Sequence, residues 1–149
     1  MIKIRIQPED FDIGAEIAAL HTAVKGIGAV ATFTGLVRPD DGFTALVLEH
    51  YPQMTDREIA RIAQDAQNRW PLLGVTIIHR VGRLVPGAQI VFIAVAAVHR
   101  SAAFQACEFL MDYLKTQAPF WKQEERGAQS GWVEGKSSDI QAAQRWKDK

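Results

Sequence analysis

Cysteine is almost absent from this sequence: Cys107 is the only one among 149 residues. A lone cysteine excludes a disulfide within the chain, and the apolar neighbours of Cys107 are typical of a small buried side chain rather than of a nucleophile. A chain without disulfides suits a reducing compartment, so we expect a cytoplasmic protein.

An excess of charge of either sign is also missing. Seventeen basic and seventeen acidic residues give a net charge of zero, so the chain has no overall field that would collect nucleic acid or an anionic membrane surface. The longest apolar run, residues 90–98, is less than half of the roughly 20 residues that a membrane-spanning helix needs. We therefore expect neither nucleic acid nor a membrane as a partner.

The short motifs of several enzyme classes are absent as well. The sequence has no Gly-x-Ser-x-Gly, Cys-x-x-Cys or His-Glu-x-x-His motif and no glycine-rich phosphate loop, which weakens hydrolase, zinc-enzyme and nucleotide-binding interpretations. We expect no metal and no cofactor. Any anion that the protein binds must therefore be held by individual basic side chains.

Length and hydrophobic content predict a single α+β domain over residues 1–149. With 48% hydrophobic residues, the chain can bury one core but is short for two. Apolar residues alternate in the expected strands and recur at helical spacing in the expected helices. The expected strands are residues 1–7, 26–38, 44–51, 75–81, 88–98 and 132–133, and the expected helices start at Asp12, Thr55, Ser101 and near Ser138.

Two of these predictions concern how elements pair and begin. Residues 26–38 are typical of a central strand that pairs with residues 44–51 in a hairpin. Thr55 and Glu58 have the spacing of a capping box, which predicts the start of the helix that follows. Together the elements predict a mostly antiparallel sheet covered by helices.

Basic side chains lie at the ends of several expected elements. Arg38 ends a strand, and His99 and Arg100 join another strand to a helix, so we expect these three to converge on one mouth that suits an anionic ligand. Lys115, in the last turn of a helix, is favoured by the helix dipole. Lys122 follows an aromatic pair that would desolvate its ammonium and suit it to acid–base chemistry. Taken singly, each of these residues is more often an exposed charge.

The residue pattern by itself leaves two functions open. One is an enzyme that acts on an anionic substrate, and the other is a noncatalytic dimeric module that binds a phosphorylated metabolite. His21, His50 and His79 do not decide between them, because histidines beside helix or strand formers are usually hydrogen-bonded packing residues.

Four segments of the chain resemble the large, catalytic subunit of molybdopterin synthase. They are ATFTGLVR (31–38), LEHYPQMT (48–55), VHRSAAF (98–104) and MDYLKTQAPFWKQE (111–124). Their order and spacing match, and MDYLKT-x-APFWK is a specific signature. The resemblance implies an α/β hammerhead with additional antiparallel strands. It also implies a homodimer of large subunits within a heterotetramer, with one small subunit at each outer end.

The same resemblance implies a reaction. The catalytic subunit transfers sulfur to cyclic pyranopterin monophosphate and so forms the dithiolene of molybdopterin, a step of molybdenum cofactor biosynthesis. The sulfur arrives on the C-terminal Gly-Gly thiocarboxylate of a small ubiquitin-like partner subunit. A sulfur carried by another chain explains why this chain needs no cysteine nucleophile.

Site residues are implied position by position. Lys115 and Lys122 match the catalytic lysines, which also contact substrate. The residues that match the pterin-binding positions are Arg38, His99 and Arg100, with Leu36, Val37, Gln123 and Glu124 as further candidate contacts. Lys136 stands where the family often has an arginine that reaches the site of the dimer mate. The chain departs from the family at Leu36, where many members carry a basic or polar residue, and in its short loop over residues 39–43.

Overall fold

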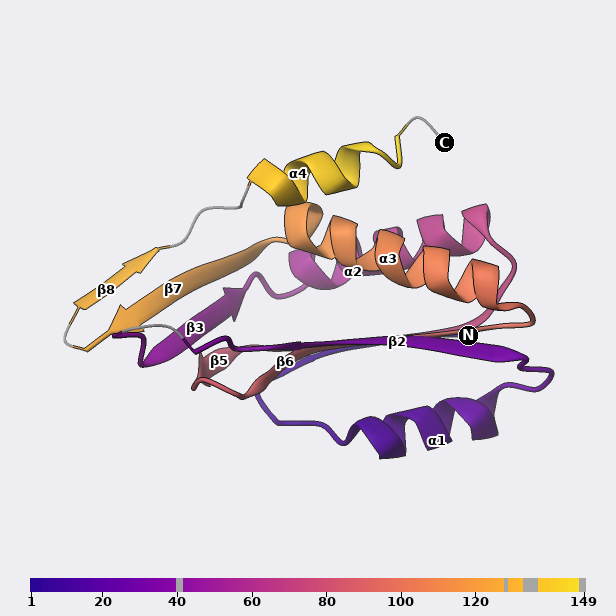
Figure 1. The fold of residues 1–149 in the computed structure, drawn as a ribbon, viewed down its shortest axis with the longest axis horizontal. Helices are drawn as coiled ribbons and strands as arrows, with labels where there is room; N and C mark the ends of the chain where they lie inside the picture. The colour runs from indigo at the N-terminus through magenta and orange to yellow at the C-terminus, as the bar shows by residue number, and fades with distance from the viewer. Residues whose placement is uncertain (40–41, 128, 133–136, 148–149) are drawn as a thin grey trace.

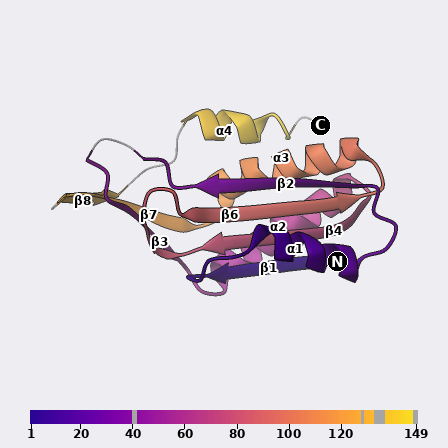
Figure 2. The ribbon, with the colours of Figure 1, turned by 60° about the horizontal axis from the view of Figure 1, so that its bottom comes forward.

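The computed structural model describes residues 1–39, 42–127, 129–132 and 137–147, and within them eight strands form two four-stranded sheets. In the first sheet the strand order is β1-β4-β6-β2, which Figure 2 shows edge to edge. Its strands are β1 (Ile2–Gln7), β4 (Leu72–Arg80), β6 (Gln89–Ala97) and β2 (Ala29–Leu36). The second sheet has the order β5-β3-β7-β8, with β5 (Gly82–Leu84), β3 (Ala45–His50), β7 (Phe120–Arg126) and β8 (Gln129–Trp132).

Helices cover both faces of the first sheet (Figure 1). Helix α1 (Ile13–Ala23) packs on one face, α2 (Met54–Arg69) and α3 (Arg100–Gln117) pack on the other, and α4 (Ser137–Gln144) lies over α3. Strand β6 runs between the two helical layers and is buried from Val91 to Ala97, as a strand covered on both faces must be. Among the described residues, no helix is long and apolar enough to cross a membrane.

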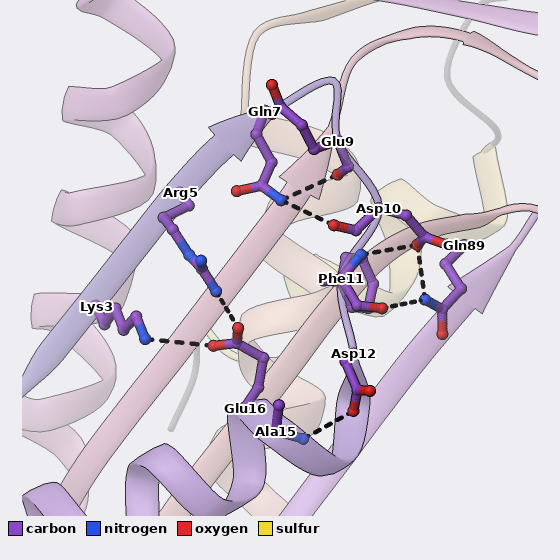
Figure 3. Close-up of polar contacts among 10 residues, drawn as sticks. All are labelled: Lys3, Arg5, Gln7, Glu9, Asp10, Phe11, Asp12, Ala15, Glu16 and Gln89. Atoms are coloured by element: carbon purple, nitrogen blue, oxygen red, sulfur yellow. Dashed lines mark hydrogen bonds and ion pairs between the residues drawn. The ribbon is translucent and has the colours of Figure 1, made fainter.

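The N-terminal segment is held by the contacts drawn in Figure 3. The Asp12 carboxylate accepts a hydrogen bond from the Ala15 N–H (2.8 Å) and caps α1, as predicted. Gln89 at the start of β6 donates to Asp10 (2.8 Å) and to the Phe11 carbonyl (2.8 Å). These bonds tie the turn before α1 to the end of the first sheet at which β6 begins.

The predicted antiparallel character is confirmed, because β1 with β4 is the one parallel pair among the described strands. Two predictions about pairing are wrong. Strand β2 is an edge strand rather than a central one, since it pairs with β6 alone. It forms no hairpin with the next strand, because β3 turns into the second sheet and pairs there with β5 and β7.

Other corrections concern where elements begin and end. Helix α2 starts at Met54, and the cap is made by Asp56, whose carboxylate accepts from the Gln53 N–H (3.2 Å), rather than by Thr55 and Glu58. Strands β5 and β7 were not expected from the sequence, because β5 is very short and β7 is largely polar. The last strand ends at Trp132, and the Val133 that was expected to extend it lies outside the described residues.

Candidate active site

Lys115 and Lys122 lie on either side of the connection between α3 and β7. Lys115 is in the last turn of α3, and Lys122 is the third residue of β7, where it pairs with Leu48 of β3. Side chains alternate between the faces of a strand, so Lys122 shares a face with Phe120. The Phe120 ring stacks on the imidazole of His79, with ring centroids 3.9 Å apart. Lys122 therefore projects toward the side of the strand on which His79 lies.

His79 is a buried histidine at the end of β4. Its Nδ1 lies 2.9 Å from the Arg80 carbonyl oxygen, which can only accept, so Nδ1 carries the proton of the neutral ring. The pKa of His79 is lowered to about 4, mainly by burial and also by the positive charges of Lys122, Lys115 and His50, while the bond to Arg80 acts in the opposite direction. Both lysines are thus close enough to act electrostatically on one neutral imidazole.

The predicted role of His79 as a hydrogen-bonded packing residue is confirmed, but its place beside the lysines was not foreseen. His79 and Lys122 are far apart in sequence, and the contact depends on β4 and β7 lying in different sheets. The sequence signal for this role was a histidine next to the end of a strand whose residues from Gly74 to Ile78 are buried.

The predicted pterin-binding residues fall into two groups. Along the sheet, Gly35 pairs with Val91 and Val91 pairs with His79, so Arg38 just beyond β2 lies at the same end of the first sheet as His79. His99 and Arg100 follow β6 and begin α3 at the other end, where Ala29 pairs with Ala97. Lys115 lies fifteen positions after Arg100 in the same helix, which is an axial rise of about 22 Å.

The expectation that Arg38, His99 and Arg100 converge on one mouth is therefore wrong within a single chain. Strands β2 and β6 are antiparallel, so the end of one lies beside the beginning of the other. The structure brings Arg38 to the end of the first sheet near which the lysines lie, and it leaves His99 and Arg100 exposed at the opposite end.

The remaining candidates differ in what they offer a ligand. Leu36 is exposed, whereas Val37 is buried and its backbone is already paired, with its N–H bonded to Ala88 (2.9 Å) and its carbonyl to Gly87 (2.8 Å). In β7, Glu124 shares a face with Lys122 and Gln123 points to the other face. Lys136 lies outside the described residues.

Cys107 is buried in the apolar cluster under α3, as predicted. Burial, with the nearby Glu108 carboxylate, raises the pKa of its thiol to about 11, so very little thiolate forms at neutral pH. In the described part of the chain, no three His, Cys, Asp or Glu side chains gather in a way that could hold a metal ion.

Comparisons with known proteins identify the family of this chain. The family model described as "MoaE protein" matches residues 6–117. The Molybdopterin synthase catalytic subunit of Mesorhizobium japonicum is 56% identical over 97% of this chain and 92% of its own length. The protein of the same name from Pseudomonas aeruginosa is 53% identical over 97% of this chain and 99% of its own length.

Solved structures agree as well and confirm the predicted α+β fold with added antiparallel strands. The Molybdopterin biosynthesis MoaE protein from Burkholderia ambifaria superposes with a TM-score of 0.88 at 51% identity and covers 99% of both chains. A Helicobacter pylori chain, solved as a complex of subunits 1 and 2 of Molybdopterin-converting factor, has the same fold, with a TM-score of 0.75 at 19% identity over 91% of this chain and 92% of its own. By sequence and by fold, this chain belongs to the MoaE family of molybdopterin synthase catalytic subunits.

Proposed function

We propose that this chain transfers sulfur from the C-terminal thiocarboxylate of a small ubiquitin-like partner subunit to cyclic pyranopterin monophosphate, which forms the dithiolene of molybdopterin. The observation that carries the proposal is that Lys115 and Lys122 both lie near the neutral, buried His79, at the end of the first sheet that also presents Arg38. The Helicobacter pylori structure, a complex of two subunits, supports a partner subunit, and the proposal is that this partner brings the sulfur.

The two ammonium groups suit the charge that sulfur transfer develops. Attack on or by a thiocarboxylate concentrates negative charge, and a fixed cation at that point stabilises the transition state by a few kcal/mol, about as much as an oxyanion-hole donor does. One lysine would face the thiocarboxylate carbonyl and the other would serve acid–base and electrostatic roles. The neutral imidazole near them adds no positive charge that would compete for the anion.

Binding of the phosphorylated pterin requires a second group of cations. Arg38 offers a guanidinium fork that suits a phosphate, but His99 and Arg100 are too far from the lysines of their own chain to help. In a homodimer, a second copy would supply them. We therefore propose a homodimer of single-domain chains that completes each site from both copies, with Lys136 a further contribution from the mate, within a heterotetramer in the reducing cytoplasm.

The experiment mixes the protein with the thiocarboxylated partner and cyclic pyranopterin monophosphate and measures the dithiolene product. We expect Lys115→Ala and Lys122→Ala each to lower turnover by about a hundredfold or more while pterin affinity changes little. Lys147→Ala removes an exposed lysine that follows α4 in the sequence. This variant is the matched control and should keep wild-type turnover. Pterin binding without any product, with authentic partner and substrate, would instead identify the noncatalytic binding module.

A further inference from the structure

A single buried hydroxyl joins three elements next to the lysine pair. The ladder between β3 and β7 ends where His50 pairs with Phe120, so Tyr51 and Pro119 would form the next pair. The Thr55 hydroxyl stands between them: it accepts from the Tyr51 N–H (3.0 Å) and donates to the Pro119 carbonyl (2.9 Å). Thr55 is completely buried. Its side chain thus replaces a rung of the sheet and attaches the first turn of α2 to both strands.

The carbonyl that Thr55 holds belongs to the segment between the two lysines. Pro119 follows Lys115 by four residues and precedes Lys122 by three. Proline has a fixed φ and no N–H, so the carbonyl of Pro119 is the one backbone group of this residue that can form a hydrogen bond. A bond at that carbonyl therefore constrains where α3 ends relative to where β7 begins.

The same segment is anchored from the first sheet. Phe120, directly after Pro119, stacks on His79 with an angle of 17° between the rings. Thr55 holds the turn from α2, and His79 holds it from β4, so two elements distant in sequence fix one short connection. Neither contact uses an atom of a lysine side chain.

We propose that Thr55 is a positioning residue for sulfur transfer: through the Pro119 carbonyl, it sets the placement of Lys122 relative to Lys115. The inference rests on the proposed function of the two lysines. A catalytic group that is displaced by about 1 Å can lose up to a hundredfold in rate, which is why a hydroxyl that touches no reactant can control turnover.

The test compares variants that remove or retain the hydroxyl. Thr55→Val keeps the shape of the side chain and removes both bonds, and we expect kcat per folded protein to fall about tenfold with little change in KM for cyclic pyranopterin monophosphate. Thr55→Ser keeps the hydroxyl and should restore most of the rate. Thr44→Val is the matched control, because the Thr44 hydroxyl donates to the Glu125 carbonyl (2.9 Å) near the far end of β7, and it should keep the wild-type kcat.

A second readout does not depend on activity. In Thr55→Val, the amide signals of residues 120–122 should shift in NMR spectra, and the Tyr51 amide should exchange its hydrogen faster, while the rest of the spectrum stays the same. If Thr55→Val does not fold, Thr55→Ala provides the hydroxyl-free comparison with Thr55→Ser.

The outcomes separate the two proposals. A wild-type kcat in Thr55→Val, or an equal loss in Thr44→Val or Thr55→Ser, would overturn the positioning role while the lysine variants still lose turnover. If instead the lysine variants keep full turnover, the proposed function fails, and the NMR shifts in Thr55→Val would still show that the hydroxyl places the segment.

Discussion

His79 shows how one residue can link the stability of the fold to the site. Burial holds its pKa near 4, below the ordinary histidine value of 6.5, so the folded protein resists protonation of the ring. At pH values between these two, the unfolded chain binds a proton that the folded chain does not. Stability is therefore complete above about pH 6.5 and is lost as the pH falls toward about 4, by about 3 kcal/mol in total.

Urea unfolding at a series of pH values measures this loss. We expect the slope of the unfolding free energy against pH between 4 and 6.5 to flatten in His79→Gln, which cannot titrate, even though the variant is less stable throughout. His21→Gln removes an exposed histidine of α1 and should leave the slope unchanged. An unchanged slope in His79→Gln would show that other groups cause the pH dependence.

Single residues also show what the sequence could reveal about the site. Lys115, Lys122 and Arg38 were predicted from their places at element ends and from the motif around them, and the structure brings all three to one end of the first sheet. His79 and Thr55 could not be predicted in the same way. Their importance comes from contacts with Phe120 and Pro119, distant in sequence, which only the packing of the two sheets and α2 creates.

At the scale of elements, the helices that depend on neighbouring residues were predicted correctly, whereas the pairing of distant strands was not. The cap at Asp12 and the apolar spacing along α2 depend on neighbours within one or two turns, and both elements form as expected. The hairpin between β2 and β3 was wrong because strand character does not identify the partner. The strand that pairs with β3 is β7. Because β7 is rich in charged residues, its sequence lacks the apolar alternation that predicts a strand.

Trp146, just beyond α4, attaches the segment that follows this helix to α2 and α3. Its ring packs edge-on against Trp70 and Phe109, its indole N–H donates to the Asp112 carboxylate (2.6 Å), and its carbonyl accepts from Arg69 (2.8 Å). We expect Trp146→Ala to lower the free energy of unfolding by about 3 to 5 kcal/mol, because it removes a large buried ring.

The variant Trp146→Phe separates the two contributions of this side chain. It keeps an aromatic ring but loses the N–H donor to Asp112, and we expect a smaller loss of about 1 to 3 kcal/mol. Urea midpoints at an unchanged m-value measure both effects. Equal losses in the two variants would mean that the hydrogen bond rather than the ring packing secures the C-terminal end.

At the scale of the whole molecule, the fold separates cations that the proposed reaction would need in one site. The class of fold was predictable from alternating strand and helix patterns, but the antiparallel pairing of β2 with β6 was not, and its direction decides which end of the sheet carries Arg38. One chain presents Arg38 and the lysines at one end and Arg100 at the other. A twofold dimer that sets the Arg100 end of one chain against the lysine end of its mate would reunite them twice, once in each site.

Mixing two variants with impaired turnover tests whether the sites are shared in this way. Arg38→Ala and Arg100→Ala should each weaken pterin binding and lower turnover. After subunit exchange between equal amounts, half of the dimers contain one chain of each kind, and one of their two sites has both arginines, so about one quarter of wild-type turnover should return. Mixing Lys115→Ala with Lys122→Ala is the matched control, because both lysines of a site come from one chain and no combination restores them. Failure of the arginine pair to recover, with exchange verified by mass spectrometry, would place each complete site within a single chain and remove Arg100 from it.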